Sequence, residues 1–430
     1  MTSHPTSGAI QPSGMTIAEK ILARASGTQR VKPGDVVEVE PDVLVLLDGN
    51  FMKGIGFELP RVAFPERIVV VFDHFVPARA TPATEALARG REFVTRFGID
   101  RFHDVGPDQG ISHQLVCDLG YVRPGQLIVS MDSHTCAAGS MNALGGALGP
   151  VDMAEVAVLG RTWFRCGPTV RYELSGGPGP GVAPKDVFLE IAGRFGDHTL
   201  ANLEFVGSGV AAWSVQQRKA LATMCAELGA QFAVFPSDEV LAAHLAALGI
   251  DDPDRGSVEP DPDARYEADR QIELAALEPM VALPHGVINN TLPVKSVGAV
   301  PVTRCFVGSC ANGTLSDLQE AAEIVNGRRI ATGVTFIVTP GSEAIHRRAV
   351  DLGYVKTLAE AGAVVTTASC GSCAGLGSEV AGAGERVVSS STRNYRGRMG
   401  SPDAQVYLAS TATVAASAVA GRIVSALEVN

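Results

Sequence analysis

The chain has 430 residues, of which 46% are hydrophobic and 19% are charged. This is the composition of a globular protein, and the length exceeds what a single hydrophobic core usually supports, so two or three domains are expected. The formal net charge is −11. Apart from the short stretch 393–398 the sequence has no basic cluster, which argues against a protein that binds nucleic acid.

The predicted elements begin with a helix. Residues 1–14 are polar and are expected to form a disordered tail, and the capping-box pattern of Thr16 and Glu19 then opens a helix that runs to about Arg24. Further along, short apolar runs of the kind found in buried parallel strands alternate with helical patterns. The predicted strands are residues 67–72, 126–130, 303–307, 335–339, 363–368 and 386–390, and the predicted helices are residues 81–97, 153–162, 215–228, 316–326, 342–352 and 406–420.

Strands that alternate with helices indicate parallel α/β units, so the predicted fold class is α/β with mainly parallel sheets. Residues 1–14 lack the apolar core of a signal peptide, and residues 406–420 are too few to span a bilayer. We therefore expect a cytoplasmic protein that does not contact a membrane. Its eight cysteines are expected to be reduced thiols that bind metal or pack in the core.

Polar side chains follow two of the predicted strands at the point where each strand ends. The pair Asp73-His74 follows the strand 67–72, and the triplet Asp132-Ser133-His134 follows the strand 126–130. Ligands of parallel α/β sheets bind beyond the carboxyl ends of the strands, so these side chains are expected to share one site. A histidine beside a carboxylate can hold a proton near neutral pH and direct it, which the expulsion of a hydroxyl group as water requires.

Four further residues are candidates for the same site. His113 lies at the start of a helix, and Glu204 is a carboxylate in an apolar run, where burial would raise its pKa. Arg393 and Arg398 could clamp the carboxylates of a substrate. Taken singly, each has an ordinary alternative as a hydrogen-bonded structural histidine, a solvated strand residue or part of a basic surface loop.

Three cysteines suggest a metal centre. Cys370 and Cys373 form a Cys-x-x-Cys pair, and Cys310 follows a predicted strand far upstream. An iron–sulfur cube held by three thiolates has one iron with an open position, where Lewis-acid chemistry takes place. The spacing alone also allows a thioredoxin-like dithiol or half of a zinc site. The remaining cysteines are interpreted as buried small hydrophobes: Cys117, Cys136, Cys166, Cys225 and Cys305.

In combination, these segments resemble the aconitase superfamily, and within it the large subunits of two-subunit isopropylmalate and homoaconitate dehydratases. The resemblance extends from about Met15 to the C-terminus, and the presence of Trp163-Phe164 looks most like the archaeal-type branch. The matching segments are residues 15–22, Asp73-His74, Asp132-Ser133-His134-Thr135-Cys136, Gly308-Ser309-Cys310, Thr339-Pro340-Gly341-Ser342, Cys370-Gly371-Ser372-Cys373 and Arg393-Asn394-Tyr395-Arg396-Gly397-Arg398.

The resemblance implies three α/β/α domains around a labile [4Fe-4S] cluster, and we place the domains at residues 15–170, 171–285 and 286–430. It also implies the roles of individual residues. These are Cys310, Cys370 and Cys373 as cluster ligands, Asp73 and His74 as the pair that protonates the departing hydroxyl, His113, Asp132, His134 and Glu204 as residues that arrange water, and Ser133, Arg393 and Arg398 as substrate-binding residues.

The family's substrate base is a serine in a Gly-Ser-Ser-Arg loop on a swivelling fourth domain, and these 430 residues do not contain that loop. We therefore predict a separate small subunit that carries the serine, so that the active enzyme is a heterodimer. The predicted reaction is dehydration or isomerisation of a hydroxy-dicarboxylate, with 3-isopropylmalate, in leucine biosynthesis, as the leading substrate.

Several substitutions near the expected site leave the substrate open. Leu47, Met131, Ala311, Thr314 and Thr392 stand where relatives usually have other residues. Homoaconitate, methylmalate or dimethylmalate are alternative substrates. A non-catalytic iron–sulfur sensor that binds RNA is an alternative of another class, which the histidine–carboxylate pairs and the lack of a basic face disfavour.

Overall fold

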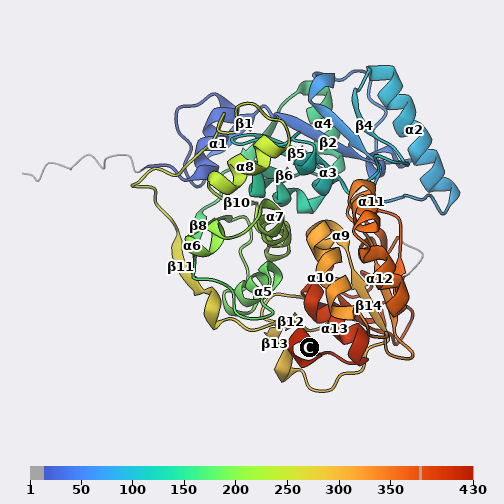
Figure 1. Ribbon diagram of the computed structural model, residues 1–430. Coiled ribbons are helices and arrows are strands. Elements are labelled where there is room, and N and C mark those ends of the chain that lie inside the picture. Colours follow the sequence, from blue (N-terminus) through green and yellow to red (C-terminus); the bar gives the residue numbers. More distant parts are fainter. Residues whose placement is uncertain (1–13, 377–379, 430) are drawn as a thin grey trace, which may run out of the picture.

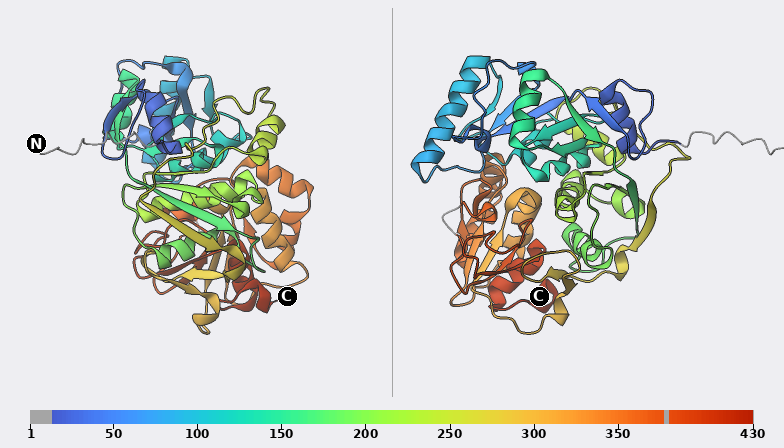
Figure 2. Two further views of the ribbon diagram at one scale, coloured as in Figure 1. Left: turned by 90° about the vertical axis from the view of Figure 1, so that its left-hand side faces the viewer. Right: turned by 180° about the vertical axis from the view of Figure 1, so that it is seen from behind.

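The structure, a computed structural model, describes residues 14–376 and 380–429. The expected disordered tail lies outside these residues except for Gly14, which forms an isolated β-bridge with Ala264. Three sheets with their helices form three regions that meet near the centre of the molecule (Figures 1 and 2). A short antiparallel ribbon of β1 (Val36–Val39) and β7 (Thr162–Arg165) accompanies the first sheet.

The first sheet has the order β4-β3-β2-β5-β6, and all its neighbours are parallel. Val45 and Val69 pack into one hydrophobic cluster, whereas the adjacent Leu46 and Val70 pack into another. Because both faces are covered, successive residues must all be apolar, which explains the continuous apolar runs. The strands are β2 (Val43–Leu47), β3 (Ile68–Val71), β4 (Arg101–His103), β5 (Leu127–Ser130) and β6 (Leu144–Ala147), and the helices of this region are α1 (Ile17–Ser26), α2 (Thr81–Phe97), α3 (Ser112–Asp118) and α4 (Pro150–Leu159).

The second sheet is a parallel sheet of four strands in the order β10-β9-β8-β11. Its strands are β8 (Thr169–Ser175), β9 (Asn202–Val206), β10 (Phe232–Val234) and β11 (Ala268–Glu273), and the helices between them are α5 (Pro184–Arg194), α6 (Ser208–Ala211), α7 (Val215–Met224) and α8 (Glu239–Ala247).

The third sheet has the order β13-β12-β18-β17-β14-β15-β16, in which only β12 and β13 pair antiparallel to their neighbours. Its strands are β12 (Met280–Ala282), β13 (Thr291–Pro293), β14 (Arg304–Val307), β15 (Thr335–Val338), β16 (Val364–Val365), β17 (Arg386–Ser389) and β18 (Gln405–Ala409). Its helices are α9 (Ser309–Asn312), α10 (Leu315–Val325), α11 (Glu343–Asp351), α12 (Tyr354–Ala361) and α13 (Thr411–Ala420).

The predicted fold class, α/β with mainly parallel sheets, is confirmed, and most predicted elements occur within two residues of their expected bounds. The predicted helix 406–420 was wrong in its first third, because Val406, Tyr407 and Leu408 belong to β18 and the helix begins only after Ser410. β-branched and aromatic residues favour a strand there, and serine favours a helix start. The predicted strand 363–368 is reduced to the two residues of β16.

The carboxyl ends of the first and third sheets lie against each other. The backbone amide of Cys370, beyond β16, donates to the carbonyl of Asp73, beyond β3, at 2.9 Å, and Ile111 donates to Gly341 at 2.8 Å. Segments that are distant in the sequence are thereby joined at one edge. Within the described residues, no helix combines the length and apolar character needed to cross a bilayer.

Candidate functional site

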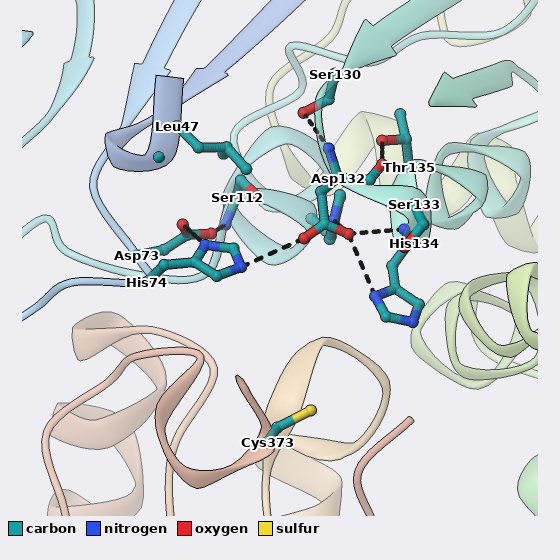
Figure 3. Close-up of polar contacts among 12 residues, drawn as sticks. Leu47, Asp73, His74, Ser112, Ser130, Asp132, Ser133, His134, Thr135 and Cys373 are labelled. Atoms are coloured by element: carbon teal, nitrogen blue, oxygen red, sulfur yellow. Dashed lines mark hydrogen bonds and ion pairs between the residues drawn. The ribbon is translucent and has the colours of Figure 1, made fainter. Parts of the chain in front are cut away.

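Asp132 lies at the centre of a group of three histidines. It caps the 3-10 helix Ser133–Met141 that follows β5, and its Oδ1 accepts from the backbone amide of His134 at 2.7 Å. The same oxygen lies 3.1 Å from His113 Nε2 and 3.2 Å from His134 Nδ1, while Oδ2 lies 3.4 Å from His74 Nε2. The carboxylate therefore faces three imidazole rings, two of which appear with it in Figure 3.

The pair Asp73-His74 lies immediately beyond β3 and is fixed by the backbone around it. Asp73 Oδ1 lies 2.6 Å from His74 Nδ1, and Asp73 Oδ2 accepts from the amide of Ser112, the first residue of α3, at 2.8 Å. Asp48, beyond β2, accepts from the amides of His74 and Phe75 at 3.0 and 2.7 Å. His74 thus has a carboxylate at each ring nitrogen, Asp73 on one side and Asp132 on the other.

Neighbouring charges keep two of these imidazoles, those of His74 and His134, protonated. Burial by itself lowers the pKa of His74 and of His134, but the charge of Asp73 in the first case and of Cys310 in the second raises each well above its usual value, with hydrogen bonds to Asp132 adding to both. Burial raises the pKa of the Asp132 carboxyl, but the charge of His113 and the polar contacts with the three histidines together outweigh burial and hold this pKa well below the usual range. Near neutral pH, an ionised Asp132 therefore lies between protonated His74 and protonated His134.

The three candidate cysteines approach this group from the third sheet. Cys310 lies on α9 beyond β14, Cys370 and Cys373 lie beyond β16, and all three are buried. The Cys373 side chain points toward the row of His74, Asp132 and His134 (Figure 3). A hydrogen bond with Cys370 lowers the pKa of Cys373 well below its usual value despite burial, and the charge of Arg398 acts in the same direction.

The spacing of the sulfurs distinguishes between the possible metal centres. Sulfurs bound to one tetrahedral zinc ion at about 2.3 Å lie about 3.8 Å apart. Among the described residues, the only three potential ligands with all their atoms within 4.8 Å of one another are Asp48, Asp73 and His74, which are engaged in the hydrogen bonds above. The sulfurs of Cys310, Cys370 and Cys373 are therefore not all within 4.8 Å of one another, although Cys370 and Cys373 lie within hydrogen-bonding reach. This spacing does not suit one tetrahedral zinc ion held by all three thiolates, and a bulkier cluster fits it better.

Arg393 joins the site through a residue that sequence reasoning missed. Its Nε donates to Glu227 Oε1 at 2.6 Å and its Nη2 donates to Ser133 Oγ at 2.6 Å. Glu227 Oε1 also lies 2.8 Å from His134 Nε2. Arg398 lies on the cysteine side, with its Nη2 4.0 Å from the sulfur of Cys373.

Glu204 does not join this group. It lies within β9, where its Oε2 accepts from the amide of Ile17, the first residue of α1, at 3.2 Å and its Oε1 accepts from the Tyr266 hydroxyl at 2.6 Å. Burial raises its pKa, as expected. Both of these partners of Glu204 lie outside the group around Asp132, so its role in arranging water stays a prediction, whereas Glu227 contacts His134 and Arg393 directly.

Several buried polar atoms of the site have no hydrogen-bond partner in the described part of the chain. They are His113 Nε2, Ser112 Oγ, Asn312 Oδ1 and Arg398 Nε. His113 Nε2 is close to Asp132, but the geometry is not that of a hydrogen bond. Because buried polar groups are normally satisfied, this concentration of unfilled donors and acceptors around the cysteines indicates a site for a polar ligand.

Cavities reach the site from two sides. One of about 140 Å³ is lined by His74, Thr339, Ser369 and Ser372. Another, of about 690 Å³, is lined by Ser133, by many apolar and glycine residues, and by the polar residues Asp152, Thr162, Arg165 and Gln231. The imidazole of His74 and the hydroxyl of Ser133 are therefore accessible to a small molecule.

The matching family model is that of the aconitase family (aconitate hydratase), over residues 70–296 and 287–421. The chain belongs to the aconitase family. It is 46% identical to the 3-isopropylmalate dehydratase large subunit of Mycolicibacterium smegmatis, with 97% of this chain and 98% of that protein covered. It is 40% identical to the 3-isopropylmalate dehydratase large subunit 1 of Methanopyrus kandleri, with 95% and 98% covered. The crystal structure of Thermococcus kodakaraensis aconitase X (holo-form) is similar with a TM-score of 0.49 and 10% identity, covering 85% of this chain and 88% of that one.

Proposed function

We propose that the chain is the large subunit of a 3-isopropylmalate dehydratase, a hydro-lyase that depends on a [4Fe-4S] cluster. The main support from the site is the ionised Asp132 among three histidines, facing three buried cysteines. Support for the substrate comes from the relatives of that name, which the chain matches over nearly its whole length.

Cys310, Cys370 and Cys373 are the residues that would hold the cluster, and its open iron supplies a Lewis acid for the substrate hydroxyl when bound. His74 is the proposed general acid. It is protonated because Asp73 and Asp132 face its two ring nitrogens, and the same contacts fix the orientation of the ring. Its two ring protons therefore lie at defined places, on Nδ1 beside Asp73 and on Nε2 beside Asp132. A proton held in this way can be transferred to a departing hydroxyl group.

His113 and His134 are proposed to orient water through Asp132. Both rings approach the same carboxylate oxygen, so both lie beside Asp132. The unfilled Nε2 of His113 is available to a water molecule or a substrate oxygen. Because His134 also contacts Glu227, its ring has partners at both nitrogens and cannot turn freely.

Arg393 and Arg398 are proposed to bind the two carboxylates of the substrate. Arg393 is held against Ser133 and Glu227, while the buried Nε of Arg398 has no partner in the described residues. Planar guanidinium groups suit paired hydrogen bonds to carboxylates. Two such groups on one loop fit a dicarboxylate better than a monocarboxylic acid.

We also propose the partner and the compartment. Relatives named as large subunits support a small subunit, and we propose that it carries a swivelling domain with the serine that acts as substrate base, in a heterodimer. The eight cysteines are all free and buried, and a labile cluster on free thiols fits a reducing compartment, so we place the enzyme in the cytoplasm.

The test is to purify the chain without oxygen, load it with iron and sulfide, and mix it with the small subunit. With 3-isopropylmalate we expect absorbance from a new carbon–carbon double bond, and no turnover from either subunit alone. Turnover of homoaconitate, methylmalate or dimethylmalate in place of 3-isopropylmalate would change the substrate but keep the reaction. A colourless protein without iron, or one inactive on all four acids, would overturn the proposal.

A further inference from the structure

Lys185 is a fully buried cation in the second region of the molecule. It is the second residue of α5, and only 1% of it is exposed. Its Nζ donates to the carbonyls of Ser390 and Ser391 at 2.5 and 2.8 Å and lies 3.8 Å from the sulfur of Met224. Within the described residues it forms no ion pair with a carboxylate.

Both the burial and the position of this cation are unfavourable by themselves. An ammonium group removed from water costs several kcal/mol unless it is compensated, and a positive charge in the first turn of a helix opposes the helix dipole. Carbonyl dipoles offset part of this cost. The rest requires negative charge nearby.

The negative groups around Lys185 include two of the candidate cluster ligands. Burial lowers the pKa of Lys185 to about 8, and this is opposed by the charges of Asp317, Cys373, Cys310 and Asp186. The Asp317 carboxylate does not bind Lys185 directly. It accepts hydrogen bonds from Thr314, Asn312 and Thr411.

The carbonyls that Lys185 binds belong to the segment that joins both cysteine loops to the arginine loop. Ser390 Oγ accepts from the amide of Gly308, two residues before Cys310, at 3.1 Å. Thr392, which follows Ser391, places its hydroxyl 3.6 Å from the sulfur of Cys373. The ammonium group therefore binds the backbone segment whose side chains contact Gly308, beside the Cys310 loop, and Cys373.

We propose that Lys185 is a positioning residue that supplies the buried counter-charge of the three-thiolate site. Its positive charge offsets the mutual repulsion of three buried thiolates, and its hydrogen bonds hold the carbonyls of the segment that leads to Arg393. This inference rests on the proposed iron–sulfur function. It would connect α5, a helix of the second region, with the cysteine site, which belongs to the third region.

Three substitutions separate the charge from the hydrogen bonds. Lys185→Arg keeps the charge, Lys185→Gln keeps a donor without charge, and Lys185→Met keeps neither. Each full-length variant is loaded with iron and sulfide, and the midpoint potential of the bound iron is followed by electron paramagnetic resonance. Loss of a nearby positive charge favours the oxidised form, so we expect more negative potentials and faster iron loss to a chelator in the Gln and Met variants, and a potential near wild type in the Arg variant.

Unfolding by denaturant distinguishes this role from ordinary packing. The Met substitution is expected to change the stability of the iron-free chain little and to lower that of the loaded chain. The control Arg218→Met removes another fully buried cation, one that is paired with Asp238 at 2.6 Å. It is expected to destabilise both forms equally and leave the potential unchanged.

An unchanged potential in both the Gln and Met variants, or full rescue by Gln, would overturn the counter-charge role. So would equal losses of stability in the iron-free and loaded chains. Failure of the wild-type chain to bind iron would instead overturn the proposed function itself, and the inference with it.

Discussion

Two glutamates in this chain show the difference between a carboxylate that serves the site and one that serves the fold. Glu227 contacts His134 and Arg393, which come from the first and third regions of the molecule. Glu204 lies inside β9, and each of its oxygens has a partner, the amide of Ile17 or the hydroxyl of Tyr266. Glu204 is fully buried, and the side chain of Glu227 is only 12% exposed, so burial alone separates them little.

What separates them is the surroundings. The amide of Ile17 belongs to the first turn of α1, where an acidic group stabilises the helix, so Glu204 has a complete structural explanation. Glu227 lies in the short 3-10 helix Cys225–Leu228 at the end of α7, where the helix dipole disfavours a carboxylate. A charge placed against local electrostatics requires compensation from elsewhere, and here His134 and Arg393 provide it.

The largest effect is expected at the cysteines. Cys373→Ser should abolish both iron binding and turnover, because a hydroxyl group is a poor replacement for a thiolate ligand. Iron and sulfide content, the visible spectrum and turnover with the small subunit are measured on anaerobically prepared protein. The control is Cys305→Ser, a buried cysteine inside β14, which should retain iron. A Cys373→Ser variant that kept iron and activity would contradict the ligand assignment.

The next largest effect is expected at Asp132. Asp132→Asn should lower kcat by about 10²- to 10⁴-fold, the range for loss of organised acid–base catalysis. Because the hydrogen bond to the Asp132 carboxylate helps to raise the pKa of His74 and of His134, the substitution lowers both pKa values. A reaction that needs protonated His74 should then decline at a lower pH than in the wild type, so the alkaline limb of the kcat/KM profile moves toward acid.

The control for this substitution is Asp104→Asn, which removes a surface carboxylate paired with Arg91 at 2.7 Å. It should leave the pH profile unchanged. If the alkaline limb of the Asp132→Asn variant stayed in place, His74 would not be the acid that limits the rate at high pH.

A smaller effect is expected at Glu227. Glu227→Gln removes the charge that holds Arg393 and His134, so we expect a fall of about 10- to 100-fold in kcat/KM, equivalent to about 1.4–2.8 kcal/mol. The KM for the dicarboxylate should rise because Arg393 is no longer fixed. Steady-state kinetics with the small subunit in excess separate kcat from KM. Wild-type kinetics would place Glu227 outside the site.

The sequence predicts the fold class and most elements because strands covered on both faces require continuous apolar runs, as in Ile68–Val71. It also predicts that residues at strand ends meet, and Asp73-His74, Asp132 and His134 do meet there. Glu204 was selected for its apolar surroundings although it lies within a strand. Glu227 could have been found from a different signal, namely a lone carboxylate at the end of an apolar helix.

Other features depend on tertiary structure that no local pattern encodes. Lys185 is an ordinary polar residue in the sequence, and only the packing of α5 against the segment after β17 buries it. The role of Thr392 becomes visible only in the folded chain, where its hydroxyl lies 3.6 Å from the sulfur of Cys373.

The smallest effect on catalysis is expected at Glu204, where the comparison is sharpest. Glu204→Gln should leave kcat and KM unchanged, since its partners are Ile17 and Tyr266 and none of the catalytic groups. An amide presents one acceptor and one donor where the carboxylate presented two acceptors, so one buried donor loses its partner, at a cost of about 1–3 kcal/mol. Denaturant unfolding of the iron-free chain measures this cost, and Tyr266→Phe, which removes one of the two donors, is the matched variant. A tenfold loss of kcat at unchanged stability would return Glu204 to the site and remove the distinction between the two glutamates.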